Sequence, residues 1–164
     1  MNLTSLMGNR LPNGSVLQTL FYTNSANTVL TNVVPWDTTI PQITEGTQIF
    51  SQSITPSSIS NKIRIRCIFA IVRQPSSGNL IAGSIFRNST SDAIFSAAGN
   101  GQSSTSNREP DQLIMEWIDS PATTSATTYS IRIGPDQATF YLNGESTGVM
   151  IGMIATLSLE EIKA

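Results

Sequence analysis

Apolar and polar side chains alternate along most of this chain of 164 residues, and turn-forming residues interrupt the alternation about every ten positions. The segment 62–72 shows the pattern most clearly, because every second side chain from Ile63 to Ile71 is apolar. The opposite face is basic in its first half and apolar from Ile68 to Val72. A period of two indicates a β-strand with one face in the core. The change on the second face predicts that the strand becomes covered on both sides halfway along.

The same alternation predicts eight further strands. They are expected at residues 14–23, 47–54, 79–86, 93–96, 112–118, 127–133, 138–142 and 150–159. The last six residues have helical propensity, but the alternation before them favours a final strand. Short strands separated by turns predict an all-β domain, with two antiparallel sheets packed as a sandwich.

Two segments fall outside the strand pattern. Residues 1–10 carry Leu3, Leu6 and Met7 at helical spacing, which fits either one short helix or a frayed terminus. Residues 97–110 form the longest predicted loop, with the sequence AAGNGQSSTSNREP. A loop of this length in a compact domain is typically functional or mobile.

The charge content argues against some classes of binding partner. Charged residues make up 12% of the chain, about half the usual fraction, and the net charge is −2. Nucleic-acid binding depends on clustered Lys and Arg side chains, and no basic block occurs here. No apolar run reaches the roughly 20 residues that span a bilayer, and no signal-peptide layout opens the chain. We therefore expect neither nucleic acid nor membrane insertion.

The single cysteine, Cys67, cannot form an internal disulfide and lies in the apolar row of 62–72. We expect it to be a buried, unreactive side chain. One cysteine without a disulfide framework fits synthesis in a reducing cytoplasm.

The chain has few residues suited to catalysis. The chain has no histidine, the commonest general base and metal ligand. A serine nucleophile would have only Lys62 or Lys163 as a base, and Lys62 belongs to a charged strand face. Carboxylate pairs such as Glu109 with Asp111 fit ordinary surface charge, although a small glycan depolymerase stays as a minor alternative. We predict no enzyme, no metal and no cofactor.

What is left is a binding surface. Aromatic rings stack on sugar faces, and amide, guanidinium and carboxylate groups in neighbouring loops bind hydroxyl groups. Trp36 lies near a loop, in Val34-Pro35-Trp36-Asp37, whereas Trp117 lies in an apolar run and is expected in the core. The predicted receptor-binding residues are Trp36, Asn88, Asn100, Asn107, Arg108 and Glu109.

Four stretches carry a resemblance to a known family. The segment 54–65, ITPSSISNKIRI, is similar to a pattern found in tail-fibre and related receptor-binding or virion proteins of bacteriophages. Gly14-Ser-Val-Leu-Gln resembles the opening strand of the same domains. The segments 138–144 and 155–162 resemble their closing strands. These motifs are strand and turn signatures, so they specify a fold family better than a ligand.

The resemblance implies a jelly-roll-like knob at the tip of a phage fibre, normally a homotrimer. Residues 1–13 would then be a short stem or linker and residues 14–164 the head domain, with sister chains covering faces such as the outer side of 68–72. The implied function is attachment to a receptor on the bacterial host surface, a glycan or a protein with the glycan favoured, by a virion protein made in the host cytoplasm. The alternative is a structural decoration or head-fibre protein that contacts only other virion proteins.

Overall fold

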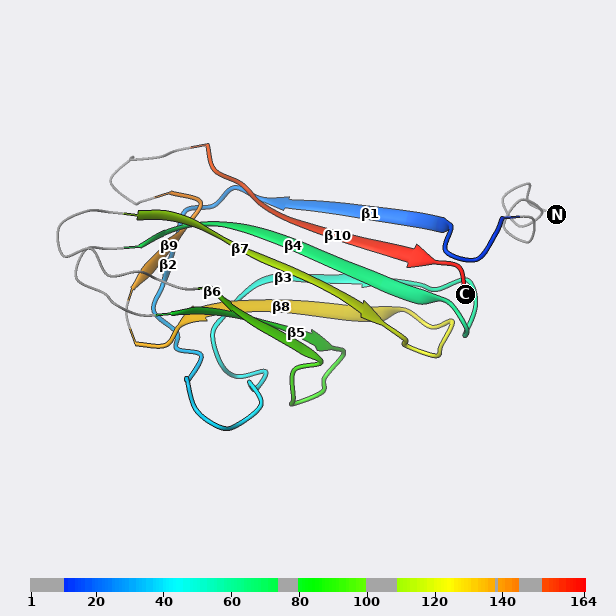
Figure 1. The fold of residues 1–164 in the computed structure, drawn as a ribbon, viewed down its shortest axis with the longest axis horizontal. Coiled ribbons are helices and arrows are strands. Elements are labelled where there is room, and N and C mark those ends of the chain that lie inside the picture. The colour runs from blue at the N-terminus through cyan, green and yellow to red at the C-terminus, as the bar shows by residue number, and fades with distance from the viewer. Residues whose placement is uncertain (1–10, 74–79, 100–108, 138, 145–151) are drawn as a thin grey trace.

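The computed structural model describes residues 11–73, 80–99, 109–137, 139–144 and 152–164. Ten strands and no helix occur in this part of the chain, and the strands form two stacked antiparallel sheets (Figure 1). The strands are β1 (Val16–Asn24), β2 (Thr28–Leu30), β3 (Thr47–Ile54), β4 (Lys62–Arg73), β5 (Ile81–Arg87), β6 (Phe95–Gly99), β7 (Glu109–Asp119), β8 (Thr127–Pro135), β9 (Phe140–Leu142) and β10 (Ala155–Ile162). The predicted all-β sandwich is confirmed.

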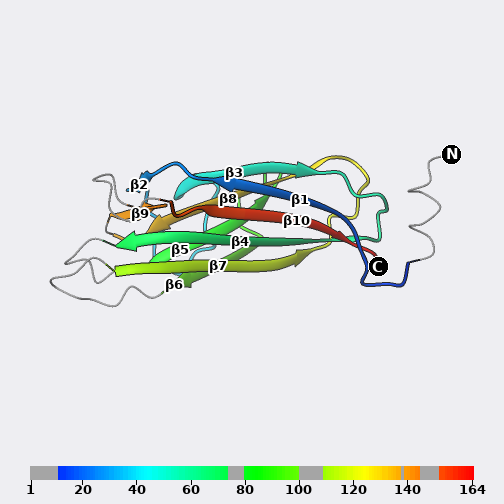
Figure 2. The same ribbon diagram turned by 90° about the horizontal axis from the view of Figure 1, so that it is seen from above.

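The strand order of the two sheets is that of a jelly roll. The second sheet runs β3-β8-β5-β6. In the first sheet β7 pairs with one side of β4. On the other side of β4, β10 pairs with its first part and β9 with its last part. β10 pairs in turn with β1, and β9 with β2. With β1–β2 and β9–β10 counted as one row each, both sheets have four rows. Viewed from above, the first sheet lies over the second (Figure 2). Eight rows in these orders form a jelly roll.

The core lies between the sheets, where the apolar row of β4 is completely buried. Ile63, Ile65, Cys67, Phe69 and Ile71 each have no exposed surface, as the alternation predicts. The row packs against buried side chains of β8 and of β10, and all belong to one hydrophobic cluster. Burial of this continuous apolar layer is the main source of stability in a two-layer fold.

The outer face of β4 changes along its length, also as predicted. In the first half Arg64 pairs with Glu160 of β10. In the second half Ala70 and Val72 are 8% and 1% exposed. A single chain therefore already covers this part of the strand, and the expectation that sister chains cover it is wrong for these two residues.

Strand ends differ from the predictions where the local pattern is weak. β2 has only three residues and was not predicted. β7 begins at Glu109 rather than 112, because it pairs only with β4 among the described strands and an edge strand tolerates Pro110, which lacks an N–H. β6 extends to Gly99, so residues 97–99 of the predicted loop 97–110 belong to β6, and residues 109 and 110 belong to β7. Residues 100–108 and residues 1–10 lie outside the described residues.

The break between β1 and β2 is held by one buried asparagine. The side chain of Asn143 donates to the carbonyl oxygens of Asn24 and Ala26, and its backbone N–H donates to Ala70. Asn143 has φ 61°, a left-handed conformation that asparagine tolerates better than most residues. The turn predicted after β9 is thus also the link that keeps both halves of the edge row in register.

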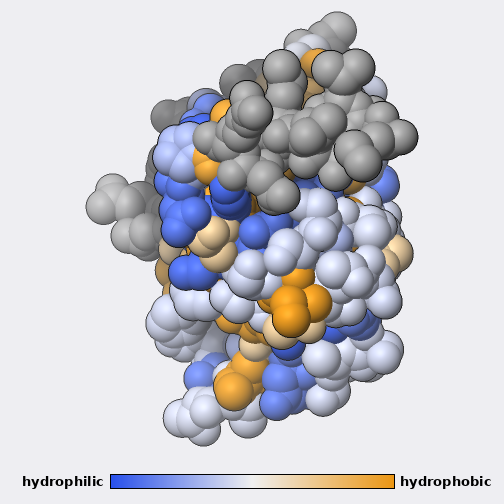
Figure 3. Space-filling model, turned by 90° about the vertical axis from the view of Figure 1, so that its right-hand side faces the viewer, coloured by the Kyte–Doolittle hydropathy of each residue, from blue (hydrophilic) through white to orange (hydrophobic). Residues whose placement is uncertain are grey.

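Three of the four motif stretches meet at a buried carboxylate. Glu161 of β10 is 1% exposed and accepts hydrogen bonds from Gln18 of β1 and from Ser57 and Asn61 in the turn before β4. The distances are 2.6–2.7 Å. Since these residues come from the opening strand, the 54–65 segment and the closing strand, the motifs encode a structural junction. The end of the sandwich that carries this turn is mainly hydrophilic, with small separate apolar patches (Figure 3).

Candidate ligand-binding groove

A groove of about 310 Å³ lies on the outer side of the second sheet. One wall is the segment between β2 and β3, and the floor is formed by β5 and β6. The wall residues are Val34, Pro35, Trp36, Asp37, Thr39 and Pro41, and the floor residues are Ala82, Ser96, Ala97 and Ala98. This volume is at the lower end of the range for small-molecule sites and fits about one or two sugar rings.

The wall is anchored to β8 by its backbone. Val34 donates its N–H to the carbonyl oxygen of Pro135, and Gly46 donates to Val33. The guanidinium of Arg132 donates to the carbonyl oxygens of Glu45 and Gly46 at 2.7 and 2.9 Å. A segment without regular structure is in this way held against a strand, which positions its side chains over the floor.

Trp36 is the dominant side chain of the wall. It is 69% exposed, the largest exposed fraction among the large apolar side chains of the described residues. A tryptophan gains most from burial, so an exposed one beside a groove marks a surface for a flat apolar partner.

Asp37 places a fixed negative charge next to this tryptophan. Its Oδ1 accepts hydrogen bonds from the hydroxyl and the backbone N–H of Thr39, at 2.6 and 2.7 Å. These two bonds lower the pKa of Asp37 below its usual value. The carboxylate is therefore ionised at neutral pH, and its second oxygen is free of the turn that fixes it.

The floor is flat because its side chains are small. Ala82 lies opposite Ala98 in the β5–β6 register, and Ser84 lies opposite Ser96. The hydroxyl groups of Ser84 and Ser96 are 3.0 Å apart and share a hydrogen bond. A floor of methyl and hydroxyl groups leaves room for a ring to lie between β5–β6 and Trp36.

No family model matches this chain, and no curated protein matches it. Solved structures that resemble the fold include the infectious bursal disease virus Gt strain, at 13% identity and TM-score 0.44, covering 92% of this chain and 39% of that one. A second is the infectious bursal disease virus VP2 subviral particle, at 8% and 0.41, covering 90% and 40%. A third is dimeric latent PorU from Porphyromonas gingivalis, at 11% and 0.34, covering 84% and 13%. This chain thus spans about two fifths of the viral chains, and the likeness concerns the fold alone.

The structure places two of the predicted binding residues apart. Trp36 lies in the groove, whereas Asn88 lies in the turn after β5, at the end of that strand remote from Ala82. Asn88 has φ 55°, and its backbone N–H and side-chain oxygen both bond Thr128. Its side chain therefore shapes a turn.

The other predicted residues belong to the segment 100–109, which follows β6 in the sequence. The backbone of Glu109 opens β7 opposite Arg73. Asn100, Asn107 and Arg108 lie outside the described residues, and so does the side chain of Glu109. The sequence prediction also omitted Asp37 and Thr39, although an Asp-x-Thr turn next to Trp36 was a usable signal. The floor could not be foreseen, because it depends on the register between β5 and β6.

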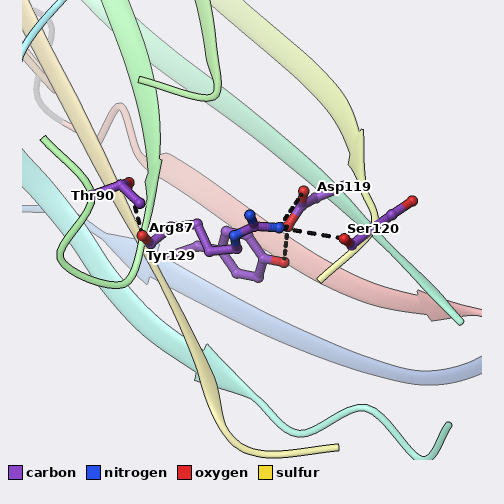
Figure 4. A network of polar contacts seen from close by, with 5 residues as sticks. All are labelled: Arg87, Thr90, Asp119, Ser120 and Tyr129. Atoms are coloured by element: carbon purple, nitrogen blue, oxygen red, sulfur yellow. Dashed lines mark hydrogen bonds and ion pairs between the residues drawn. The ribbon is translucent and has the colours of Figure 1, made fainter. Parts of the chain in front are cut away.

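A second polar cluster joins the two sheets (Figure 4). Arg87 donates to both oxygens of Asp119 at 3.0 and 3.1 Å, and the hydroxyl of the fully buried Tyr129 donates to Asp119. Burial and the neighbouring carboxylate raise the pKa of Tyr129 well above its usual value. With Tyr129 and Asp119 enclosed, this cluster is suited to holding the sheets together.

Two further carboxylate pairs, Asp119 with Asp136 and Glu160 with Glu161, are not brought together. Asp136 accepts from the backbone of Leu80, at the opposite end of β5 from Asp119. Glu160 and Glu161 point to opposite faces of β10. Within the described ranges, no three His, Cys, Asp or Glu side chains are grouped to hold a metal ion. No helix of the described residues is long and apolar enough to cross a membrane.

Proposed function

We propose that this chain is a virion domain that binds a host-surface glycan through the Trp36 groove, without catalysis. The observation that carries the proposal is the exposure of Trp36, at 69%, beside an ionised carboxylate and a flat floor. Stacking of a sugar ring on the indole would bury its apolar face, and Asp37 would accept hydrogen bonds from its hydroxyl groups. The resemblance to phage fibre and virion proteins supports the virion context.

A single shallow groove of this kind binds weakly, which makes multivalency part of the proposal. In a homotrimer, three grooves on one particle raise the apparent affinity through effective concentration, without any new contact. Light scattering of the purified chain tests this element, and a monomer at all working concentrations would remove it.

The loop after β6 is proposed as a second contact region. Ala98 lines the groove, and the loop leaves β6 at Gly99, directly after that residue. Asn100, Asn107, Arg108 and Glu109 follow or close this loop, so they come from the segment next to the floor. Arg108→Ala should then weaken host adsorption without changing the oligomeric state.

The experiment compares two exposed aromatic side chains, one in the wall of the groove beside the second sheet and one on the first sheet. Trp36→Ala should abolish binding on a glycan array and reduce adsorption to host cells. Phe21→Ala is the matched control, because Phe21 is 65% exposed on β1 of the first sheet. Binding that Trp36→Ala leaves unchanged would overturn the assignment of the groove. No binding to any glycan or host surface would overturn the function itself.

A structural virion protein is the second candidate, and one surface favours it. The outer face of the first sheet exposes Phe21, Ile114 and Ile118 at 65, 53 and 50%. Phe21 lies on β1 at one edge of this face and the two isoleucines lie on β7 at the other edge, with Ser158 and Arg66 between them. Exposed apolar side chains on a sheet face suit contact with another protein. Under this candidate Phe21→Ala would impair incorporation into particles, and Trp36→Ala would have no effect on adsorption.

A further inference from the structure

The described residues that line the groove carry charge of one sign only. Among the described lining residues Asp37 is the only side chain that ionises. The segments 31–46 and 88–99, which flank the groove, contain Asp37, Glu45 and Asp92 and no lysine or arginine. The nearest basic group on the anchoring strand, Arg132, is occupied by the carbonyl oxygens of Glu45 and Gly46. The described lining residues therefore present a ligand with a carboxylate and no cation.

The polar groups of the groove favour a ligand that donates hydrogen bonds. Oδ1 of Asp37 is satisfied by Thr39, which leaves the other carboxylate oxygen to accept from a ligand. The hydroxyl of Thr39 donates its proton to Asp37, so towards a ligand it can only accept. A carboxylate or sulfate group on a sugar would find no cation among the described lining residues. An ammonium group would find both a carboxylate and the face of an exposed indole.

From this arrangement we infer that the Trp36 groove selects a saccharide carrying a free amine, with the ammonium group between the indole face of Trp36 and the Asp37 carboxylate. The inference rests on the proposed glycan-binding function and narrows its ligand class. The sugar ring would lie on the floor of Ala82 and Ala98, where only methyl groups oppose it. N-acetylation would remove the positive charge and add an acetyl group above this floor.

The test uses three oligosaccharide probes of equal length with the full-length chain. These are glucosamine oligomers, N-acetylglucosamine oligomers and oligogalacturonate, titrated by calorimetry in mildly acidic, low-salt buffer that keeps the amines protonated. The glucosamine oligomer should bind about threefold to tenfold more tightly than its acetylated counterpart, as one cation–π contact and one ion pair at an exposed site allow. Oligogalacturonate should bind most weakly.

Two variants with the same charge change assign the preference to one residue. Asp37→Asn keeps an oxygen for Thr39 but removes the charge, and should bring the ratio between the amine and acetylated probes close to one. Glu116→Gln removes a charge from β7 of the other sheet, where it pairs with Arg66 at 3.8 Å, and should leave the ratio unchanged. Circular dichroism and a thermal melt of each variant verify folding.

The outcomes separate the two proposals. An acetylated or acidic probe that binds as tightly as the amine, or a ratio that Asp37→Asn leaves intact, overturns the amine selection while glycan binding stands. An amine preference that Glu116→Gln lowers as much as Asp37→Asn also overturns it, because the effect would then be one of net charge. Absence of binding to all probes and to a broad glycan array overturns the glycan function as well.

Discussion

The hydroxyl of Tyr129 donates a 2.7 Å hydrogen bond to Oδ2 of Asp119, and this bond joins the two sheets of the sandwich. Tyr129 belongs to β8 in the second sheet and Asp119 ends β7 in the first. Arg87, at the end of β5, completes the cluster by pairing with the same carboxylate at 3.0 Å. Three strand ends are thereby fixed relative to one another near the edge of the core.

Removing the hydroxyl of Tyr129 should lower stability modestly. Tyr129→Phe loses one buried hydrogen bond, while Asp119 keeps Arg87, so the expected cost is about 1 kcal/mol of unfolding free energy. Asp119→Ala should cost about 3 kcal/mol, because it leaves a buried hydroxyl and a half-buried guanidinium without their partner. Urea unfolding measures both.

A matched control separates the hydrogen bond from loss of a polar group in general. Tyr22→Phe changes a half-buried tyrosine of β1 that packs against the core cluster. Its unfolding free energy should change by less than about 0.5 kcal/mol. Equal costs for Tyr22→Phe and Tyr129→Phe would contradict a special role for the bond between the sheets.

Glu161 should make the fold sensitive to acid. Burial raises the pKa of this carboxyl group, but hydrogen bonds from Asn61, Ser57 and Gln18 outweigh burial, and the net pKa lies below its usual value. A pKa that is lower in the folded state stabilises the fold above the unfolded pKa, about 4.3, and this stability is lost as pH falls through the folded pKa.

The test of Glu161 compares two neighbouring glutamates. Glu161→Gln should destabilise the protein at neutral pH and flatten the fall in stability between about pH 5 and pH 3. Glu160→Gln is the control, because Glu160 pairs with the partly exposed Arg64 on the outer face. Thermal melts across this pH range distinguish the two, and parallel profiles for the wild type and Glu161→Gln would contradict the prediction.

Whether the sequence predicted a feature depends on how far apart in the chain its interacting residues lie. The buried row of β4 is a local pattern of alternating side chains, and β3 was predicted with its observed ends, Thr47 and Ile54. The junction at Glu161 joins residues as far apart as Gln18 and Glu161, so similarity to a family could flag the motifs without revealing their contact.

The groove likewise combines a residue that the sequence singled out with a floor that it did not predict. Trp36, singled out in the sequence because it lies near a loop, is 69% exposed. The expectation that Trp117 lies in the core is wrong, because it is 40% exposed and stacks on Phe95 of β6. The floor of the groove depends on which residue of β6 pairs with Ala82 of β5. The connection between these two strands sets that register, and the alternation of side chains does not reveal it. Asn88 was predicted as a binding residue from its type, yet a left-handed turn uses the same side chain for its own backbone contacts.

Gly134 should be essential for the wall of the groove. A Cβ atom at this position of β8 would collide with the carbonyl oxygen of Asn32 and lie 3.0 Å from the Cα of Gly46. Both obstacles are backbone atoms of the segment that carries Trp36, and backbone cannot move aside as a side chain can. Gly134→Ala should therefore cost about 3 kcal/mol and weaken glycan binding as well.

Gly83 offers a matched comparison in the neighbouring strand β5. A Cβ atom there would meet the sulfur of Met115 at 2.7 Å and Cδ2 of Leu113 at 2.8 Å, both of them side-chain atoms. Because a methionine side chain can change rotamer, Gly83→Ala should cost only about 1 kcal/mol and leave binding intact. A larger loss for Gly83→Ala than for Gly134→Ala would contradict this account of the wall.

Cys67 should be protected from thiol reagents for as long as the fold is intact. It has no exposed surface on the inner row of β4, and burial raises its pKa to about 12. Since the thiolate is the reactive form, both access and ionisation oppose reaction in the folded state. A disulfide reagent should label Cys67 only through unfolding, so that the labelling rate rises with denaturant in step with the unfolding equilibrium.

An exposed cysteine provides the positive control for that measurement. Ile59→Cys in a Cys67→Ala background places a thiol in the turn before β4, at a position that is 66% exposed. This variant should react at the rate of an unstructured peptide thiol, without any dependence on low concentrations of denaturant. Equally fast labelling of Cys67 in the native protein would show that the two sheets separate readily, and that the sandwich core opens far below its global unfolding transition.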